Sequence, residues 1–189
     1  MDRSWFLVSK MPSCGTACSM RSSGLRPPAN GKAMTRGRRP AGLSMDTIER
    51  LLIIREIQEL KARYFRTLDS KDWDGFGAVF TTHCRFAAAR TPDDLDPEPR
   101  LGRDVIVKSV RRNVGRALTM HKGFLPEIDV NSPIAAKAIW AMSDIVEFHD
   151  GKPFRRLSGA GHYHETYALQ ENRWMIDSLT LSRLRVSIE

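Results

Sequence analysis

The apolar residues between positions 46 and 68 recur at spacings of three and four, the repeat of a helix with one buried face. We therefore predict a long first helix over 46–68, with a buried stripe of Ile53, Ile57, Leu60, Tyr64 and Leu68. Ser70 is expected to open a short second helix near 70–80. A third helix is expected near 103–115, with three residues facing inward: Val105, Ile106 and Val110.

From Leu118 onward the apolar repeat changes to two, which is typical of strands with one buried face. The pattern predicts four long strands, at Leu118–Val130, Ala135–His149, Phe154–Leu169 and Arg173–Ile188. Short turn sequences separate them, so neighbours along the chain should pair antiparallel. A short strand at Cys84–Ala89 and a flexible, proline-rich acidic loop at Thr91–Arg100 are expected between the second and third helices.

These elements predict an α+β fold, in which a curved antiparallel sheet carries three helices on its concave face. Helices that close one side of a bent sheet make a cone, and the cone is expected to enclose a pocket suited to a small apolar ligand. The opposite face of the sheet would still need cover, so a homodimer or homotrimer is expected.

The charge of the chain is unevenly distributed. The formal net charge is +8, but residues 1–44 hold eight of the 30 Lys and Arg residues and one of the 22 acidic residues. The remainder, 45–189, is nearly neutral and is expected to form one domain. Residues 1–44 are rich in Gly, Pro, Ser and Arg without apolar periodicity, which predicts a disordered basic tail. The tail fits a nucleic-acid or membrane arm, a targeting segment, or an upstream start that adds dispensable residues; Met45 favours the last.

Composition also argues against several classes of partner. The basic tail has no aromatic stacking platform, so a nucleic-acid partner is not expected. The longest apolar runs are far shorter than the roughly 18 residues of a membrane span, so we expect a cytoplasmic protein without a membrane partner. The sequence has no phosphate loop, dinucleotide-binding glycine pattern or nucleophile elbow, and no cofactor is expected.

Cysteines and paired histidines give only weak metal signals. Cys14 and Cys18 lack partner ligands nearby, and Cys84 is expected to be a reduced core thiol. His162 and His164 share one strand face, but no third ligand of a suitable type accompanies them. No metal site is therefore predicted.

Tyr64 and Asp69 are the first candidates for chemistry. They lie five residues apart, and an ideal helix turns by about 140° over that distance, so they share a side only if the helix ends near Asp69. Taken by themselves, they are better explained as a core tyrosine and a capping aspartate.

Two charged residues fall on apolar strand faces. Asp144 shares a face with Trp140 and Met142, and Arg183 shares one with Leu179 and Leu181. Charges on such faces are costly to bury unless they are paired or used. The pattern leaves open a buried salt bridge, two edge positions that reach water, or a functional site. His121 lies near the start of the first long strand, and its position alone does not distinguish a structural from a catalytic histidine.

Four segments in this order resemble the SnoaL-like branch of the nuclear-transport-factor-2-like (NTF2-like) superfamily, with motifs closest to the bile-acid 7α-dehydratases. The segments are IQELKARYFRTLDSKDWD at 57–74, TMHKGFLPEI at 119–128, AIWAMSD at 138–144 and LTLSRLRV at 179–186. The resemblance covers nearly all of residues 46–188 and implies the cone-shaped fold of that superfamily.

The resemblance implies a catalytic set of five residues: Tyr64, Asp69, His121, Asp144 and Arg183, with Arg185 as an alternative to Arg183. Asp69 would orient His121, a general base, while Tyr64 would bond the carbonyl oxygen of the substrate. Asp144 would assist a departing hydroxyl or move a proton between carbons. Alternatively, Arg183 would hold Asp144 ionised, which excludes the acid role.

The predicted function is a cofactor-independent dehydratase or isomerase acting on a hydrophobic polycyclic or aromatic ketone. The alternative is a non-catalytic small-molecule-binding or assembly module of the same fold. Two departures from the dehydratase pattern, Phe124 in place of a second histidine and a longer loop at 91–100, are expected near the pocket mouth. Both argue against a bile acid as the substrate.

Overall fold

The computed structural model describes residues 45–149 and 154–189. The predicted tail over 1–44, with Cys14 and Cys18, and the predicted turn at 150–153 lie outside these residues. The elements follow in the order α1 (Thr47–Asp69), α2 (Trp73–Gly77), β1 (Phe80–Ala88), β2 (Arg100–Leu101), α3 (Arg103–Val114), β3 (Leu118–Ser132), β4 (Ala135–Glu147), β5 (Arg156–Gln170) and β6 (Arg173–Ile188).

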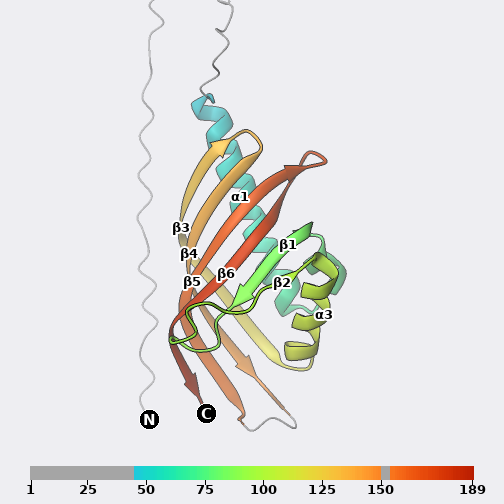
Figure 1. Ribbon diagram of the computed structural model, residues 1–189, viewed down its shortest axis with the longest axis vertical. Coiled ribbons are helices and arrows are strands. Elements are labelled where there is room, and N and C mark those ends of the chain that lie inside the picture. Colours follow the sequence, from blue (N-terminus) through green and yellow to red (C-terminus); the bar gives the residue numbers. More distant parts are fainter. Residues whose placement is uncertain (1–44, 150–153) are drawn as a thin grey trace, which may run out of the picture. The chain divides into compact units, whose positions relative to one another are not determined.

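The six strands form one curved sheet in the order β2-β1-β6-β5-β4-β3 (Figure 1). Strands β3 to β6 make the predicted antiparallel meander. Glu171 and Asn172, both with positive φ, turn the chain between β5 and β6 as a tight hairpin requires. Strand β1 runs parallel to β6, so the sheet is mixed rather than wholly antiparallel. This pairing joins strands far apart in the chain, which local turn patterns do not reveal.

Helix α1 begins where the Asp46 side chain accepts a hydrogen bond from the backbone N–H of Ile48, at 3.3 Å. All five residues of the predicted apolar stripe are buried, and the helix ends at Asp69. Ser70 caps this end, so our prediction that it opens the second helix is wrong. The cap of α2 is Asp72, whose side chain accepts from the backbone N–H of Gly75 at 2.9 Å.

The hydrophobic core lies between the helices and the inner face of the sheet. In Figure 1, α1 passes behind β4 to β6 and α3 lies beside β1. The most deeply buried apolar residues come from every layer: Ile57, Phe76, Phe80, Ile106, Ile176 and Leu179. In α3, Ile106 is buried and Val110 is half-buried, but Val105 is 54% exposed. The prediction for Val105 is wrong. Ile106 and Val110 are four residues apart and share the buried side of the helix, whereas Val105 does not lie on it.

A charged pair that the sequence analysis did not identify lies inside this core. The ammonium of Lys61 on α1 donates to the carboxylate of Glu165 on β5, and both residues are almost wholly buried. Glu165 also accepts from the hydroxyl of Tyr167, which in turn accepts from the indole N–H of Trp140 at 2.9 Å. The Lys61 Nζ atom lies 3.7, 4.2 and 4.8 Å from the ring centroids of Tyr163, Tyr64 and Phe65.

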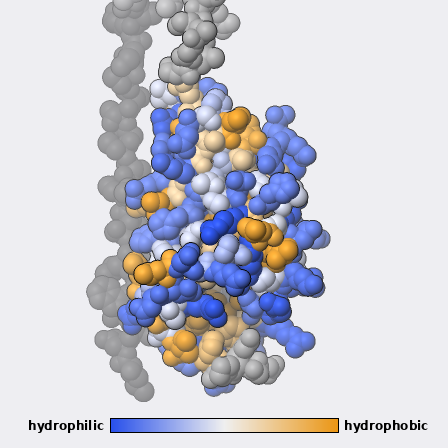
Figure 2. All heavy atoms as spheres, in the orientation of Figure 1, coloured by the Kyte–Doolittle hydropathy of each residue, from blue (hydrophilic) through white to orange (hydrophobic). Residues whose placement is uncertain are grey.

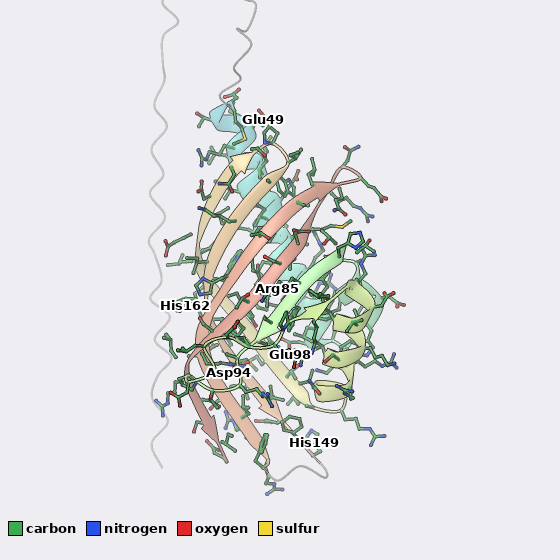
Figure 3. The ribbon with its side chains drawn as sticks, in the orientation of Figure 1. Glu49, Arg85, Asp94, Glu98, His149 and His162 are labelled. Atoms are coloured by element: carbon green, nitrogen blue, oxygen red, sulfur yellow. The ribbon has the colours of Figure 1, made fainter. Side chains whose placement is uncertain are left out.

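The outer face of the sheet is mostly hydrophilic, with separate hydrophobic patches (Figure 2). Arg85 and His162 belong to this face (Figure 3). A hollow of about 560 Å³ lies on it, lined by residues of β3 to β6 that include Lys137, Ile139 and His164. Among the described helices, none combines the length and apolar character needed to cross a membrane.

Candidate active site

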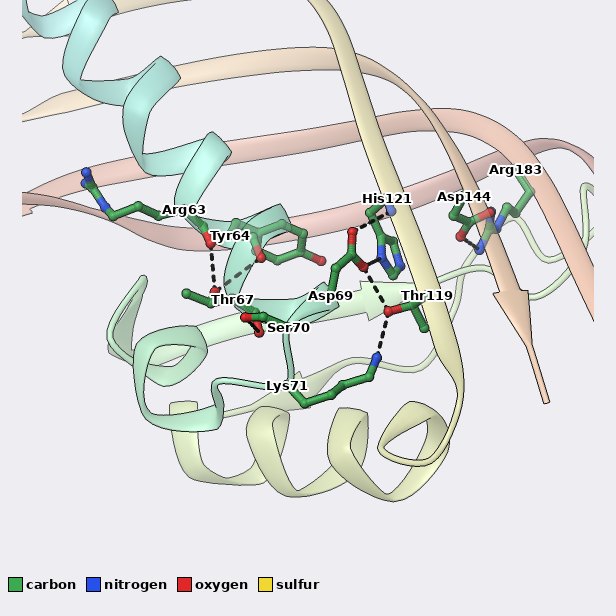
Figure 4. A network of polar contacts seen from close by, with 10 residues as sticks. All are labelled: Arg63, Tyr64, Thr67, Asp69, Ser70, Lys71, Thr119, His121, Asp144 and Arg183. Atoms are coloured by element: carbon green, nitrogen blue, oxygen red, sulfur yellow. Dashed lines mark hydrogen bonds and ion pairs between the residues drawn. The ribbon is translucent and has the colours of Figure 1, made fainter. Parts of the chain in front are cut away.

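The end of α1 delivers Asp69 to the first strand of the meander. The Asp69 Oδ1 atom lies 2.6 Å from Nδ1 of His121, and its Oδ2 atom accepts from the backbone N–H of His121 at 2.8 Å (Figure 4). A third bond comes from the hydroxyl of Thr119, which donates to Oδ1 at 2.8 Å. Tertiary structure therefore joins the two residues that the sequence left 52 positions apart.

These bonds decide which of the two residues holds the proton between them. Partial burial by itself raises the pKa of the Asp69 carboxyl, but hydrogen bonds from His121 and Thr119 outweigh it, so the pKa lies below its usual value. An ionised carboxylate only accepts hydrogen bonds, so Nδ1 of His121 must donate. When the ring is neutral, its Nε2 atom is then left with a lone pair, which is the form of a general base.

Tyr64 is part of an aromatic cluster on the inner side of α1. The residue is 2% exposed, and its ring centroid lies 5.4 Å from that of Phe76 and 6.0 Å from those of Phe80 and Tyr163. Burial raises the pKa of the Tyr64 phenol well above its usual value, and the nearby Tyr163 and Glu165 add to the effect. Tyr64 is therefore a neutral hydroxyl at ordinary pH and can donate a hydrogen bond.

Asp144 on β4 and Arg183 on β6 form a bidentate ion pair across the inner face of the sheet. Both Nη–Oδ distances are 2.7 Å, and the side chains are 3% and 10% exposed. Burial alone would lower the pKa of the Arg183 guanidinium, but bonding to Asp144 raises it. Asp144 and Arg183 therefore form the buried salt bridge that the sequence analysis left open as one interpretation. The arginine is Arg183 and not Arg185, which is exposed.

Gly159 on β5 makes room for this pair, a role that the sequence analysis missed. It lies opposite Asp144 in the β4–β5 register. A Cβ atom at position 159 would lie 2.3 Å from Nη1 of Arg183 and 2.6 Å from Oδ1 of Asp144. The guanidinium crosses β5 through the space that the missing side chain leaves. The only signal in the sequence is a pair of glycines, Gly159 and Gly161, inside a strand.

We expect Gly159→Ala to displace the Arg183 guanidinium and to lower the free energy of unfolding by about 1–3 kcal/mol, the usual cost of overpacking a tight site. Urea denaturation measures the loss. Ala160→Ser, which adds one atom on the opposite face of the same strand, is the matched control and should change stability little. An unfolding midpoint for Gly159→Ala equal to that of Ala160→Ser would contradict the steric role.

The strand register also brings His121 and Asp144 together, since they are directly paired across β3 and β4. The same alternation turns Phe124 to the outer face, where it is 48% exposed. Phe124 therefore faces away from His121, which does not fit our expectation that it lies near the pocket mouth. The loop at 91–100 does begin next to the site, because the Ala89 carbonyl accepts from Nε of Arg183 at 3.4 Å.

The histidines and the cysteine considered as metal ligands lie apart from these residues. His162 and His164 are on the outer face, with ring centroids 6.4 Å apart, and Nε2 of His164 lies 3.3 Å from Oγ of Ser182. Within residues 45–149 and 154–189 there is no cluster of three or more side chains able to hold a metal ion. Cys84 is a buried free thiol, and burial, followed by the charges of Asp177 and Glu165, raises its pKa to about 12.

None of the five candidate residues lines either of two hollows in the described part of the chain. One is the hollow on the outer face, and the other, of about 520 Å³, is lined by residues of α1, of the segment around α2 and of the start of β6. The pocket expected between the helices and the sheet therefore stays a prediction. Of the five side chains, Asp69 is the most accessible, at 24%.

Comparison with known proteins agrees with this architecture. A curved mixed sheet with helices on its inner face is the fold of the NTF2-like superfamily, and the profile of the SnoaL-like domain matches residues 49–180. The chain belongs to the SnoaL-like family. It is 30% identical over 138 residues to the probable cyclase FGR4 of Gibberella zeae, a match that covers 68% of this chain and 89% of that protein.

Solved structures share the fold at lower identity. A candidate scytalone dehydratase of Novosphingobium aromaticivorans matches with a TM-score of 0.66 and 20% identity, over 76% of this chain and 92% of that one. The hexachlorocyclohexane dehydrochlorinase LinA-type3 of Novosphingobium barchaimii matches with a TM-score of 0.64 and 14% identity, over 76% and 94%. These identities show a common fold and no more. A special closeness to the bile-acid dehydratases stays a prediction.

Proposed function

We propose that the protein is a cofactor-independent enzyme that eliminates water from, or isomerises, a hydrophobic ketone by general acid–base catalysis. The observation that carries the proposal is the contact of Asp69 with Nδ1 of His121 at 2.6 Å, which leaves Nε2 of a neutral imidazole as a base. A general base held by a carboxylate in this way is familiar from enzymes that abstract protons.

In the proposed reaction, Nε2 of His121 removes the proton from the carbon next to a ketone carbonyl. The electrons of the broken C–H bond move into an enolate, whose oxygen accepts a hydrogen bond from the neutral Tyr64 hydroxyl. Asp69 accepts the bond from Nδ1 throughout, so it stabilises the imidazolium that forms. This proton transfer needs no external oxidant or reductant.

Collapse of the enolate then expels a hydroxyl from the β-carbon. The leaving oxygen takes the proton from Nε2 of the His121 imidazolium, and the products are an α,β-unsaturated ketone and water. This assignment does not use Asp144 as the acid, because Arg183 donates to both oxygens of the Asp144 carboxyl group, at 2.7 Å each. Asp144 and Arg183 are then proposed to shape the site and to orient polar groups of the substrate.

One observation supports an apolar, ring-containing substrate, and another supports an elimination. Tyr64 is embedded among Phe65, Phe76 and Phe80, so the ligand group that reaches its hydroxyl would meet aromatic side chains. The names of the similar proteins, a dehydratase and a dehydrochlorinase, also denote eliminations. A pure ligand-binding module would have no use for an oriented base.

A second candidate reaction is ring closure, which the 30% identity to a probable cyclase favours. The same base would form the same enolate, and its carbon would then attack a second carbonyl of the same molecule. The π bond of that carbonyl would open to an alkoxide, which would take the proton back from Nε2 of the His121 imidazolium. The three candidate reactions differ in their products: elimination releases water, whereas isomerisation and the ring-closing step itself conserve mass.

The test is an assay of β-hydroxy ketones, enones and aromatic polyketones with the full chain, read by mass spectrometry and ultraviolet absorbance. We expect turnover of at least one class. Tyr64→Phe should lower kcat by about 10²–10³-fold, the usual loss for removing one donor to a developing oxyanion, while leaving ligand binding largely intact.

Tyr167→Phe is the matched control, since it removes a buried hydroxyl that bonds Glu165 and Trp140 outside the proposed site. Its kcat should stay close to that of the wild type even if its stability falls. Ligands that bind to wild type without any change in mass or absorbance would favour the binding-module alternative over the enzyme.

A further inference from the structure

Lys71 continues the network of Asp69 and His121 beyond the residues given a catalytic role. It is the second residue after the end of α1, and its Nζ atom donates to the Thr119 hydroxyl at 2.6 Å (Figure 4). Thr119 is 6% exposed and donates to Asp69, which bonds His121. Four side chains thus form one continuous chain of hydrogen bonds.

The direction of every bond in this chain follows from its outer end. An ammonium only donates, so the single proton of the Thr119 hydroxyl is left for Asp69. The Asp69 Oδ1 atom must then be an acceptor for Thr119, which disfavours a proton on that oxygen. With Asp69 ionised, the proton between it and His121 belongs to Nδ1. An uncharged residue at position 71 would remove the group at the end of the chain that can only donate. The directions of the hydrogen bonds would then no longer be fixed.

Charge gives Lys71 a second effect. A carboxylate in contact with an imidazole stabilises the imidazolium, and an imidazolium cannot act as a base. A cation on the far side of the carboxylate opposes this. The other charges that face His121 are Asp144, its partner on β4, and Arg183 on β6, which neutralise one another as an ion pair. Lys71 is therefore the cation that offsets the charge of Asp69.

The backbone conformation at Lys71 indicates that its side chain has a role at this position. Its φ angle is +62°, a left-handed conformation that glycine or asparagine adopts with less strain at the end of a helix. Lysine at this position directs a long side chain back to β3. The strain and the contact with Thr119 are independent observations on the same residue.

We propose that Lys71 is a positioning residue that acts through Thr119: it holds Asp69 as an ionised acceptor and offsets its charge, so that His121 stays neutral with its proton on Nδ1. The inference rests on the proposed function for its catalytic consequence. The contacts themselves do not depend on which reaction, if any, the site performs.

Nitrogen-15 NMR of the imidazole rings in the full chain tests this proposal without any substrate, with the His121 signals identified by their loss in His121→Gln. In the wild type, the neutral ring should carry its proton on Nδ1. Lys71→Met should raise the pKa of His121 by about 0.5–1 unit, the shift expected for removal of one partly screened charge. Lys71→Arg, which keeps a donor-only cation, should restore the wild-type titration.

Thr119 supplies an independent pair of variants in case Lys71→Met does not fold. Thr119→Val removes the hydroxyl at nearly constant volume and should also raise the pKa of His121, whereas Thr119→Ser should restore it. A wild-type ring protonated on Nε2, or identical titrations for Lys71→Met and Lys71→Arg, would overturn the inference. If the variants titrate as expected but the protein turns over no ketone, this inference stands and the proposed function is refuted.

Discussion

Replacement of His121 by alanine is expected to lower kcat by about 10²–10⁴-fold, the usual contribution of a positioned general base. The physical reason is that Nε2 of His121 is the lone pair that the bond from Nδ1 to Asp69 leaves free. Steady-state kinetics on a ketone identified in the substrate screen measures the loss, and isothermal titration should show that the ligand still binds.

His164→Ala is the matched control, because it removes an imidazole from the outer face of the same sheet. Its kcat should equal that of the wild type. Added imidazole should partly restore turnover in His121→Ala, since the ring can occupy the space that the substitution leaves. Equal kcat values for His121→Ala and His164→Ala would show that the Asp69–His121 pair is structural.

Replacement of Lys61 by methionine is expected to lower the free energy of unfolding by about 3–5 kcal/mol, the cost of leaving a buried charge without its partner. Lys61 and Glu165 are 1% and 3% exposed, so water cannot take the place of the lost ammonium. Methionine is unbranched and only one atom shorter than lysine, which restricts the change mainly to charge and hydrogen bonding. Urea denaturation at neutral pH gives the difference.

Two further variants separate charge from packing. Arg55→Met, on the exposed side of α1, removes a cation that bonds only the exposed Glu59 and should alter stability little. The double variant Lys61→Met/Glu165→Met should recover most of the lost stability, because it removes both charges from the core. A loss in the double variant as large as in Lys61→Met alone would mean that the aromatic rings around the ammonium, rather than the ion pair, supply the stability.

The candidate site was predictable where local pattern and burial carry the information. Asp144 and Arg183 stood out as charges on apolar strand faces, and the structure pairs them. Lys61 falls on the buried stripe of α1, and Glu165 lies between Tyr163 and Tyr167 on β5, so the same criterion would have found this pair. It was missed because long side chains on a helix are usually assumed to reach water.

Other parts of the site depend on contacts between residues distant in sequence. The bond between Asp69 and His121 requires the end of α1 to meet β3, and no spacing within either segment predicts it. The role of Gly159 exists only because Arg183 reaches across β5 to Asp144. Lys71 would be read as an ordinary solvated lysine without the left-handed backbone that turns it toward Thr119.

The sequence by itself determined the order of the helices and the long strands, the antiparallel meander and most of the apolar residues that face the core. Helical and strand periodicities are local, and each buried face repeats along one element. The tertiary structure decided that β1 runs parallel to β6, that Arg183 neutralises Asp144 and that Asp69 bonds Nδ1 of His121. Each of these depends on how elements meet in space. The approach of one element to another follows from the packing of the whole core and leaves no period in the chain.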